Sequence, residues 1–367
     1  MDQADLDRIL ALLRDMDGSD VHLRAGSVPR LRVNGELMRL RDEPHIVGSD
    51  VDALVPTIMH EHTLDQFLAE GEADFAYSVP GVGRFRVNAF RQRGSVGLVF
   101  RRVRHIARSF DDLGLPDVVR VLSEQPRGLV LVTGPAGCGK TTTLAAMVDH
   151  VNRTRECHIV TIEDPIEVLH QDERAAITQR EVGFDTRSFA AAMRSSLRED
   201  PDVILVGEMR DTETVETALA AADTGHLVFS TLHTVSSVET INRIVDFFPP
   251  DQQAQARRTL AGVLKGTICQ RLVPTSDGSK RVLALEVMVV NGRIQQCIAD
   301  SARTSDIEQI LIEGDYYGMQ TFDQSLVNLV EEGTIDVRAA MLAATNAHDL
   351  RIMLQRRGVV AGVPALP

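Results

Sequence analysis

The chain has 367 residues, of which 44% are hydrophobic and 25% are charged, as in an ordinary globular protein. This length exceeds what one hydrophobic core usually organises, so we expect two domains. The 39 basic and 52 acidic side chains give a formal net charge of −13, which is the wrong sign for a protein that mainly coats nucleic acid or an anionic membrane. No apolar run approaches the length of a membrane-spanning helix, and the first residues lack the features of a secretion signal, so we expect a cytoplasmic protein.

Residues 1–104 are predicted to form an α+β domain. Apolar residues at helical spacing predict an amphipathic helix over residues 6–16, and two more helical stretches lie within residues 50–69. Runs with strand-like alternation occupy residues 20–24, 30–33, 36–40, 74–79, 83–90 and 95–102. Asn34-Gly35 between the second and third runs predicts a β-hairpin, because this pair favours the tight turn that joins two antiparallel strands.

A connector over residues 105–116 precedes a second domain, residues 117–357, in which strands and helices alternate. The strand candidates are residues 128–133, 158–162, 202–206 and 226–231. Segments long enough for crossover helices separate them, which is the pattern of a parallel sheet covered by helices. Beyond residue 250 the pattern is mostly helical, with segments at 251–271, 305–313, 321–332 and 337–344. The last residues, 358–367, are rich in Gly, Pro and Val, and we expect them to be disordered.

A phosphate-binding loop, Gly-Pro-Ala-Gly-Cys-Gly-Lys-Thr, lies between the first of these strands and a helical stretch. Its glycines, Gly134, Gly137 and Gly139, let backbone N–H groups close around phosphate oxygens. Lys140 can reach the outer phosphates and the Thr141 hydroxyl can ligate Mg²⁺, with Thr142 following as a further nucleotide-binding residue. The sequence therefore predicts binding of a nucleoside triphosphate, ATP, together with Mg²⁺.

The four cysteines include no Cys-x-x-Cys pair that would supply half of a zinc site. They are Cys138, Cys157, Cys269 and Cys297. We expect buried thiols. Cys138 lies inside the phosphate loop, where the helix N-terminus would lower a thiol pKa, but it occupies a variable position of the loop and we assign it no role.

Two acidic segments are candidates for the carboxylates that hydrolysis requires. Residues 202–208 form a buried-strand pattern that ends in Glu208, and residues 161–167 end another strand in a cluster that contains Glu163. Taken alone, an acidic residue after a strand is usually a solvated loop residue or a helix cap. Two such segments in one nucleotide-binding sheet favour chemistry, because a parallel sheet delivers the carboxyl ends of its strands to the loop.

Two histidines, His226 and His233, lie at opposite ends of one strand candidate and cannot easily share a metal. A lone histidine at a strand end is more often structural than catalytic. Their spacing alone therefore supports only a weak prediction that one of them contacts phosphate.

The segment 84–104 contains seven arginines and no acidic residue, although the protein as a whole is acidic. They are Arg84, Arg86, Arg91, Arg93, Arg101, Arg102 and Arg104. On an alternating strand Arg84 and Arg86 share the face opposite Phe85 and Val87. The segment is either a solvated strand face with acidic neighbours or a group that reaches the nucleotide of a neighbouring subunit, as arginine fingers do.

Together these segments resemble the secretion-type motor ATPases, and most closely the PilT family of type IV pilus retraction ATPases. Four signatures of that family occur in order, namely the phosphate loop at 134–141, the acidic box at 161–167, the strand and acid at 204–208 and the histidine box at 224–234. Further matches lie at residues 179–183, 207–214 and 318–323. The resemblance covers nearly the whole chain.

The resemblance implies a hexameric ring in which a PAS-like N-terminal domain packs on the RecA-like ATPase domain of the next subunit, with ATP between them. It implies that Glu163 helps to activate water and that Glu208 acts near Mg²⁺, although these two roles can be exchanged. It further implies that His226 senses the terminal phosphate, with His233 a weaker candidate, and that Arg86 and Arg101 face the nucleotide. The implied partner is an inner-membrane pilus platform protein, which would hold the motor at the membrane from the cytoplasmic side.

The extra N-terminal domain and the four-cysteine zinc element of the pilus-assembly relatives are both missing, which favours the retraction branch. One stretch departs from the family pattern, Ala-Ile-Arg-Asn-Leu-Ile-Arg-Glu, because residues 293–300 replace its two arginines by Gln295 and Ala299. An accessory or divergent motor of the same family is therefore an alternative to a retraction motor. A RecA-like motor on DNA or RNA is disfavoured by the acidic balance and the absence of Trp, and a scaffold without hydrolysis by the two glutamates.

Overall fold

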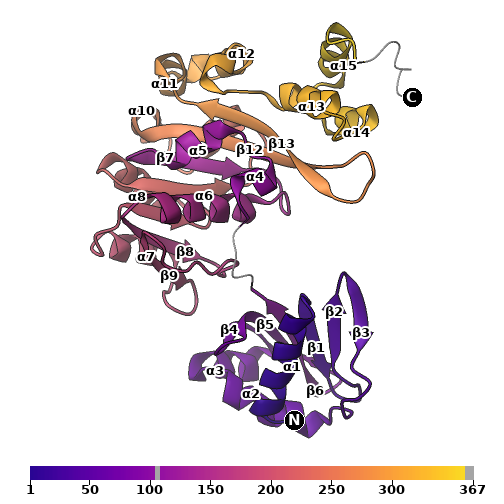
Figure 1. Cartoon of the computed structure of the whole chain (residues 1–367). Coiled ribbons are helices and arrows are strands. Elements are labelled where there is room, and N and C mark those ends of the chain that lie inside the picture. Colours follow the sequence, from indigo (N-terminus) through magenta and orange to yellow (C-terminus); the bar gives the residue numbers. More distant parts are fainter. Residues whose placement is uncertain (104–107, 360–367) are drawn as a thin grey trace. The chain divides into compact units, whose positions relative to one another are not determined.

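The computed structural model describes residues 1–103 and 108–359, which divide into two compact units (Figure 1). Arg104, the last arginine of the predicted basic segment, and residues 360–367 of the predicted tail lie outside the described residues.

The N-terminal unit contains a six-stranded antiparallel sheet in the order β3-β2-β1-β6-β5-β4. Its strands are β1 (Asp20–Arg24), β2 (Arg30–Val33), β3 (Glu36–Arg39), β4 (Glu72–Val79), β5 (Gly83–Gln92) and β6 (Ser95–Arg102). Its helices are α1 (Gln3–Asp15), α2 (Gly48–Ile58) and α3 (Glu61–Glu70). The predicted hairpin is confirmed, since Val33 pairs with Glu36 and both turn residues, Asn34 and Gly35, adopt the positive φ that such a turn requires.

The core of this unit lies between the helices and one face of the sheet. Leu6, Ile9, Leu10 and Leu13 of α1 are fully buried, as the helical spacing of apolar residues predicted. On β5 the side chains of Phe85 and Val87 point into the same core. Arg84 and Arg86 therefore lie on the opposite face of the sheet, which confirms the predicted alternation.

The second unit is built on a seven-stranded sheet in the order β13-β12-β7-β11-β10-β8-β9. The strands are β7 (Gly128–Thr133), β8 (His158–Glu163), β9 (Ala176–Glu181), β10 (Val203–Val206), β11 (Leu227–Leu232), β12 (Leu264–Pro274) and β13 (Arg281–Val289). All neighbouring pairs are parallel except β12 and β13, which are antiparallel. The carboxyl ends of six strands therefore meet at one edge of the sheet.

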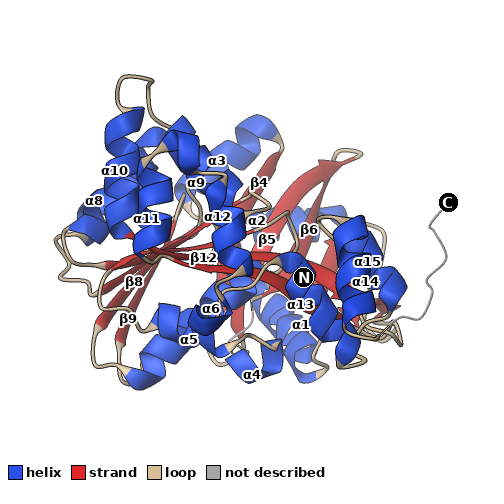
Figure 2. Ribbon diagram, turned by 90° about the horizontal axis from the view of Figure 1, so that it is seen from above, coloured by secondary structure: helices blue, strands red, loops and turns tan. Residues whose placement is uncertain are grey.

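Helices cover both faces of this sheet, with α8, α10 and α11 on one side and α5 and α6 on the other (Figure 2). The helices are α4 (Phe110–Leu113), α5 (Asp117–Ser123), α6 (Lys140–Thr154), α7 (Phe189–Ser196), α8 (Thr212–Asp223), α9 (Ser237–Asp246), α10 (Gln253–Val263), α11 (Gly292–Ala299), α12 (Asp306–Ile312), α13 (Phe322–Glu331), α14 (Val337–Ala343) and α15 (Ala347–Arg356), with 3₁₀ turns η1 (Ser301–Arg303) and η2 (Asp315–Tyr317). On β7, Leu129 and Leu131 pack into one core layer and Val130 and Val132 into the other. This two-sided burial explains why the strand is a continuous apolar run.

The region after residue 250 differs from the helical prediction. The helix expected over residues 251–271 ends at Val263, and residues 264–274 instead form β12 beside β7. Helix and strand are hard to distinguish in a short apolar run, and here the open edge of β7 decided in favour of a strand. β9 and β13 were likewise absent from the predicted set, because neither has an obvious boundary in the sequence.

The predicted connector, 105–116, contains α4, and its Phe110 and Leu115 are buried in the core of the second unit with Val119. Burial of these two side chains makes the segment from residue 110 part of the second unit. Within the described residues, no helix combines the length and the apolar character that crossing a bilayer requires.

Candidate functional site

The loop between β7 and α6 has the backbone geometry of a phosphate cradle. Gly134, Gly137 and Gly139 all have positive φ. A Cβ atom at Gly134 would lie 2.5 Å from the carbonyl oxygen of Gln270 and 2.7 Å from the Sγ of Cys138, so only glycine fits there. Gly139 is the N-cap of α6, and no side chain in the described part of the chain caps that helix. The N–H groups of its first turn are therefore available to an anion.

Side chains of the loop and of β12 hold this cradle. The Nζ of Lys140 donates to the carbonyl oxygens of Gly134 and Pro135, at 2.8 and 3.2 Å, so the ammonium lies over the loop. From β12, the buried side chain of Gln270 donates through Nε2 to the carbonyl oxygen of Cys138 at 2.9 Å. Burial raises the pKa of the Cys138 thiol, which keeps it protonated and unreactive at neutral pH.

Glu163, the last residue of β8, lies at the same edge of the sheet as the loop. Its side chain is 9% exposed, and its Oε1 accepts hydrogen bonds from the Thr161 hydroxyl at 2.7 Å and from Nε2 of Gln179 at 3.2 Å. The peptide bond between the next two residues, Asp164 and Pro165, is cis. A buried carboxylate with two donors on one oxygen is held in one orientation.

Glu208 follows β10 at this edge and lies beside two basic side chains, those of Arg210 and His233. Its Oε1 pairs with the guanidinium of Arg210, and its Oε2 lies 3.5 Å from the Nε2 of His233. His233 comes directly after β11, whose last residue, Leu232, is in register with Thr133 of β7. The strand order β7-β11-β10-β8 thus brings the loop, His233, Glu208 and Glu163 to neighbouring strand ends.

His226, the predicted sensor of the terminal phosphate, lies at the other edge of the sheet, directly before β11. Its carbonyl oxygen accepts from the N–H of Gly128, where β7 begins, and its Nδ1 lies 2.9 Å from the carbonyl oxygen of Ala221 and 3.4 Å from the Thr224 hydroxyl. The length of β7 separates it from the loop, roughly 20 Å at the usual rise per strand residue. Because β7 and β11 are parallel, the histidine that follows β11, His233, is the one beside the loop.

A cavity of about 600 Å³ in the second unit begins at the start of α6. Gly139 and Thr142 line it on the loop side, while Leu113 of α4, Leu283 of β13 and Lys280, directly before β13, line it from the other side. Thr142 is exposed and Thr141 is half-buried at the same helix start. Charged side chains line it as well, among them Arg108, Asp111 and Glu332, so a ligand there would meet polar groups as much as apolar walls.

A magnesium site made of protein side chains alone does not occur here: the described residues include no group of three His, Cys, Asp or Glu side chains that could hold a metal. Protein-bound Mg²⁺ commonly takes one or two side-chain oxygens and completes its shell with phosphates and water. The Thr141 hydroxyl and the Glu208 carboxylate are oxygen donors of the required kind at the loop edge.

In the N-terminal unit, Arg86 and Arg101 are direct cross-strand neighbours on β5 and β6. The Nε of Arg101 donates to Oδ1 of the buried Asp20 at 2.8 Å. Burial alone would raise the pKa of Asp20, but hydrogen bonds from Ser19 and Arg101 outweigh it and hold the pKa below its ordinary value. Asp20 therefore stays ionised and neutralises one of the two arginines.

The stretch that departs from the family pattern forms α11. Its apolar positions, Ile294, Cys297 and Ile298, are buried against the core, whereas Gln295 and Ala299 are exposed. The substitutions therefore change the outer face of the helix and leave its packing intact.

Sequence reasoning missed the residues that support the carboxylates, Thr161, Gln179 and Arg210, and ranked His233 below His226. A hydroxyl two residues before Glu163 on a strand shares its face, which was a usable signal for Thr161. Gln179 lies on β9, an unpredicted strand, and the match of residues 179–183 to the family pattern was the available signal for it.

Comparison with known proteins agrees with this geometry. The family model described as "Type II/IV secretion system protein" matches residues 30–341. The chain is 45% identical to the type IV pilus retraction ATPase PilT of Pseudomonas aeruginosa, over 90% of this chain and 95% of that protein. It is 38% identical to the type IV pilus ATPase PilU of the same organism, over 96% of this chain and 91% of that one.

Among solved structures, the pilus retraction motor PilT with bound ADP is similar, with a TM-score of 0.87 and 44% identity over 95% of this chain and 99% of that chain. That protein carries a nucleotide, and the phosphate cradle described above supplies a site for one in this chain. With a loop, two carboxylates and a histidine gathered at one sheet edge, and with this extent of similarity in sequence and structure, the chain belongs to the PilT family of type II/IV secretion ATPases.

Proposed function

We propose that this chain is the ATP-hydrolysing motor that powers retraction of a type IV pilus, and thereby twitching motility. The observation that carries the proposal is the convergence of Lys140, Glu163 and Glu208 at one edge of a parallel sheet, in a chain 45% identical to a pilus retraction ATPase. ATP is the substrate, and its hydrolysis supplies the work.

The loop residues bind the phosphates. The N–H groups of the first turn of α6 and the ammonium of Lys140 neutralise their charge, and Thr142 contacts the nucleotide beside them. Mg²⁺ would supply further charge neutralisation at the outer phosphates, and the Thr141 hydroxyl with the Glu208 carboxylate would hold it. Glu163 orients the attacking water and accepts its proton, and His233 contacts the terminal phosphate.

The cavity at the start of α6 accommodates the base and ribose. Leu113 and Leu283 provide apolar walls, and the ammonium of Lys280 provides a polar contact. This site continues directly from Gly139, so one ligand can occupy both the cradle and the cavity.

The working form is a homohexamer that binds an inner-membrane platform protein from the cytoplasmic side of the membrane. Arg86 and Arg101 act on nucleotide bound in the ring, since trans arginines stabilise the charge that develops during phosphoryl transfer. An accessory motor is the alternative function, favoured by the altered outer face of α11 and by 38% identity to PilU.

The first test is Lys140→Ala. We expect ATP hydrolysis by the purified chain to fall at least about 100-fold, because the variant loses the only positive side chain of the loop. In a strain lacking the gene, this variant should also fail to restore pilus retraction, measured as the width of the twitching zone.

The matched control is Lys265→Ala. Lys265 lies at the amino end of β12, beside the start of β7 and away from the loop, and we expect wild-type hydrolysis and motility. Normal hydrolysis by Lys140→Ala would refute the assignment of the nucleotide site. Normal motility of a variant that does not hydrolyse ATP would refute the role of this chain as the retraction motor.

A further inference from the structure

Two hydrogen bonds from strand residues reach the same oxygen of the Glu163 carboxylate. Thr161, two residues earlier on β8, donates its hydroxyl to Oε1 at 2.7 Å. Gln179 donates from the neighbouring strand, β9, to the same oxygen at 3.2 Å. Thr161 and Gln179 are paired in the parallel register of β8 and β9, so the two donors come from adjacent positions in the sheet.

The orientation of the Gln179 amide is determined by a second contact. Its Oε1 accepts from the backbone N–H of His170 at 2.8 Å. A backbone N–H can only donate, so the oxygen of the amide must face His170 and the NH₂ group must face Glu163. The amide therefore links the segment after the acidic box to the carboxylate itself.

Hydrogen bonds to a carboxylate favour its ionised form and restrict its rotation. Thr161 is 1% exposed and Glu163 is 9% exposed, so water screens the Thr161 contact very little. Two donors on one oxygen favour the ionised form of the carboxylate and keep its direction constant, and a group that orients water needs both properties.

We propose that Thr161 and Gln179 are positioning residues for hydrolysis, which hold the Glu163 carboxylate ionised and in the orientation that receives the attacking water. The inference rests on the proposed role of Glu163. It adds two residues, one of them on an edge strand outside the acidic box, to the set on which turnover depends.

The experiment measures ATP hydrolysis by the full chain as a function of pH in four variants. Thr161→Val removes the hydroxyl with little change in shape, and Thr161→Ser retains the donor. Gln179→Leu removes the amide. Thr178→Val is the matched control, because it removes a hydroxyl from the next residue of β9, whose side chain points to the other face of the sheet.

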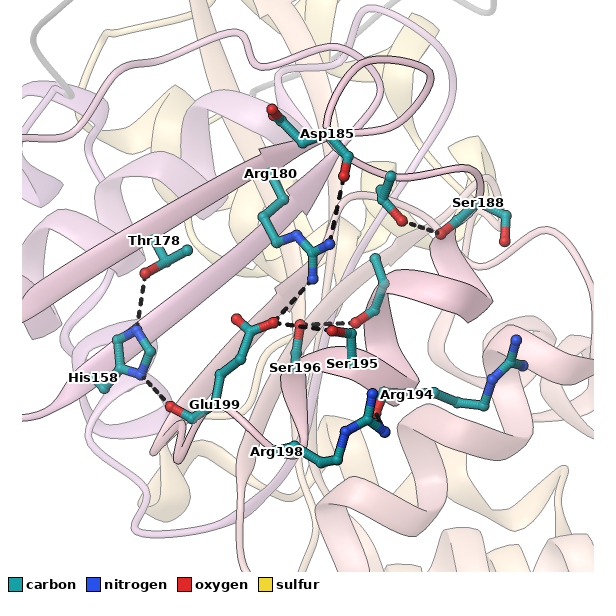
Figure 3. Close-up of polar contacts among 12 residues, drawn as sticks. His158, Thr178, Arg180, Asp185, Ser188, Arg194, Ser195, Ser196, Arg198 and Glu199 are labelled. Atoms are coloured by element: carbon teal, nitrogen blue, oxygen red, sulfur yellow. Dashed lines mark hydrogen bonds and ion pairs between the residues drawn. The ribbon is translucent and has the colours of Figure 1, made fainter.

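Figure 3 shows the surroundings of that control. The Thr178 hydroxyl contacts the Nε2 of His158 at 3.0 Å, in a group of polar side chains that includes the ion pair between Arg180 and Glu199. None of the hydrogen bonds drawn there includes Glu163. Loss of a hydroxyl at Thr178 thus perturbs the same strand pair without touching the carboxylate.

We expect Thr161→Val and Gln179→Leu to lower kcat about tenfold at neutral pH, with the KM for ATP within about twofold of wild type. The acidic limb of the pH profile of kcat should move up by about one pH unit, because the ionised carboxylate has lost a donor. Thr161→Ser should restore both the rate and the limb. Thr178→Val should match wild type.

An unchanged acidic limb in Thr161→Val and Gln179→Leu would overturn the inference, and so would an equal loss of kcat in Thr178→Val, since a purely structural role predicts both. Thermal denaturation of each variant identifies any loss of folded protein. Glu163→Gln distinguishes a failure of the role proposed for Glu163 from a failure of the positioning role proposed for Thr161 and Gln179. Full activity in that variant refutes the role of Glu163, whereas an inactive Glu163→Gln with a wild-type profile in Thr161→Val refutes the positioning role alone.

Discussion

Glu208 is the least exposed member of a group of three charged or titratable side chains at the loop edge. Its side chain is 14% exposed, whereas those of Arg210 and His233 are 64% and 61% exposed. A side chain exposed to that extent can change its rotamer at small cost. Arg210 and His233 can therefore change rotamer more readily than Glu208.

The two histidines are predicted to differ in their effect on turnover. We expect His233→Gln to lower kcat at least about tenfold, because this side chain lies beside Glu208 at the loop edge. His226→Gln should stay within about twofold of wild type, because its ring contacts Ala221 and Thr224, at the end of α8 and at the other edge of the sheet. Steady-state ATPase assays of the two purified variants measure this difference in kcat. The reverse order would mean that His226 acts on nucleotide bound to another subunit.

At the scale of elements, α11 has one face that packs against the core and another that is exposed to solvent. The three apolar positions that match the family pattern are buried, so the helix docks as the pattern implies. The two positions at which the family pattern has arginine, Gln295 and Ala299, are exposed and carry no charge. A difference from retraction motors at this helix would therefore lie in what the outer face contacts, and the stability of the fold would be unaffected.

Placing arginine at both positions tests the role of the exposed face of α11. We expect the double variant Gln295→Arg and Ala299→Arg to keep ATPase activity and melting temperature near wild type, since exposed substitutions usually change stability by about 0.5 kcal/mol or less. If the neutral face limits retraction, the twitching zone should widen. Gln296→Arg, an exposed change between the two positions, is the control. A changed ATPase rate, or an equal gain with Gln296→Arg, would contradict a specific surface role.

β12 shows how one element connects distant parts of the second unit. It pairs with β7 on one side and β13 on the other, and it supplies Gln270 to the phosphate loop. The helical prediction for residues 264–271 was wrong because the strand is specified by its neighbours. Its apolar residues fit a helix pattern as well as a strand pattern until β7 is present to pair with them.

At the scale of the whole molecule, charge is unevenly distributed. One row across the N-terminal sheet brings Arg32, Asp20, Arg101 and Arg86 side by side on an acidic protein. Like charges directly opposite one another destabilise a strand pair. Among the described side chains, Asp20 pairs with Arg101, so the positive charge of Arg86 is available to an anion from elsewhere in the assembly.

Mixed rings test whether Arg86 acts across subunits. Arg86→Ala and Glu163→Gln should each be nearly inactive alone. Rings assembled from both kinds of subunit should recover part of the activity, because some interfaces pair an intact Glu163 with an intact arginine from the neighbour. ATPase activity against mixing ratio is the measurement, with native mass spectrometry to verify mixed rings.

Arg93→Ala provides the control for these rings, since Arg93 lies in the turn between β5 and β6 and is exposed. It should be active alone. Mixed rings of Arg86→Ala and Glu163→Gln that remain inactive at every ratio would exclude a role for Arg86 in trans and leave it as part of a solvated strand face.

The sequence by itself determined the features whose causes are local. β7, the phosphate loop and the start of α6 follow from adjacent residues, because positive φ at glycine, a reaching lysine and uncapped N–H groups all arise within one short segment. The hairpin at Asn34 and Gly35 is local in the same way. Only the tertiary structure decided which separated residues meet. The parallel order of β7, β11, β10 and β8 places Glu163, Glu208 and His233 at the loop edge and His226 at the other, because strand direction and neighbour order depend on long-range pairing that no local pattern encodes.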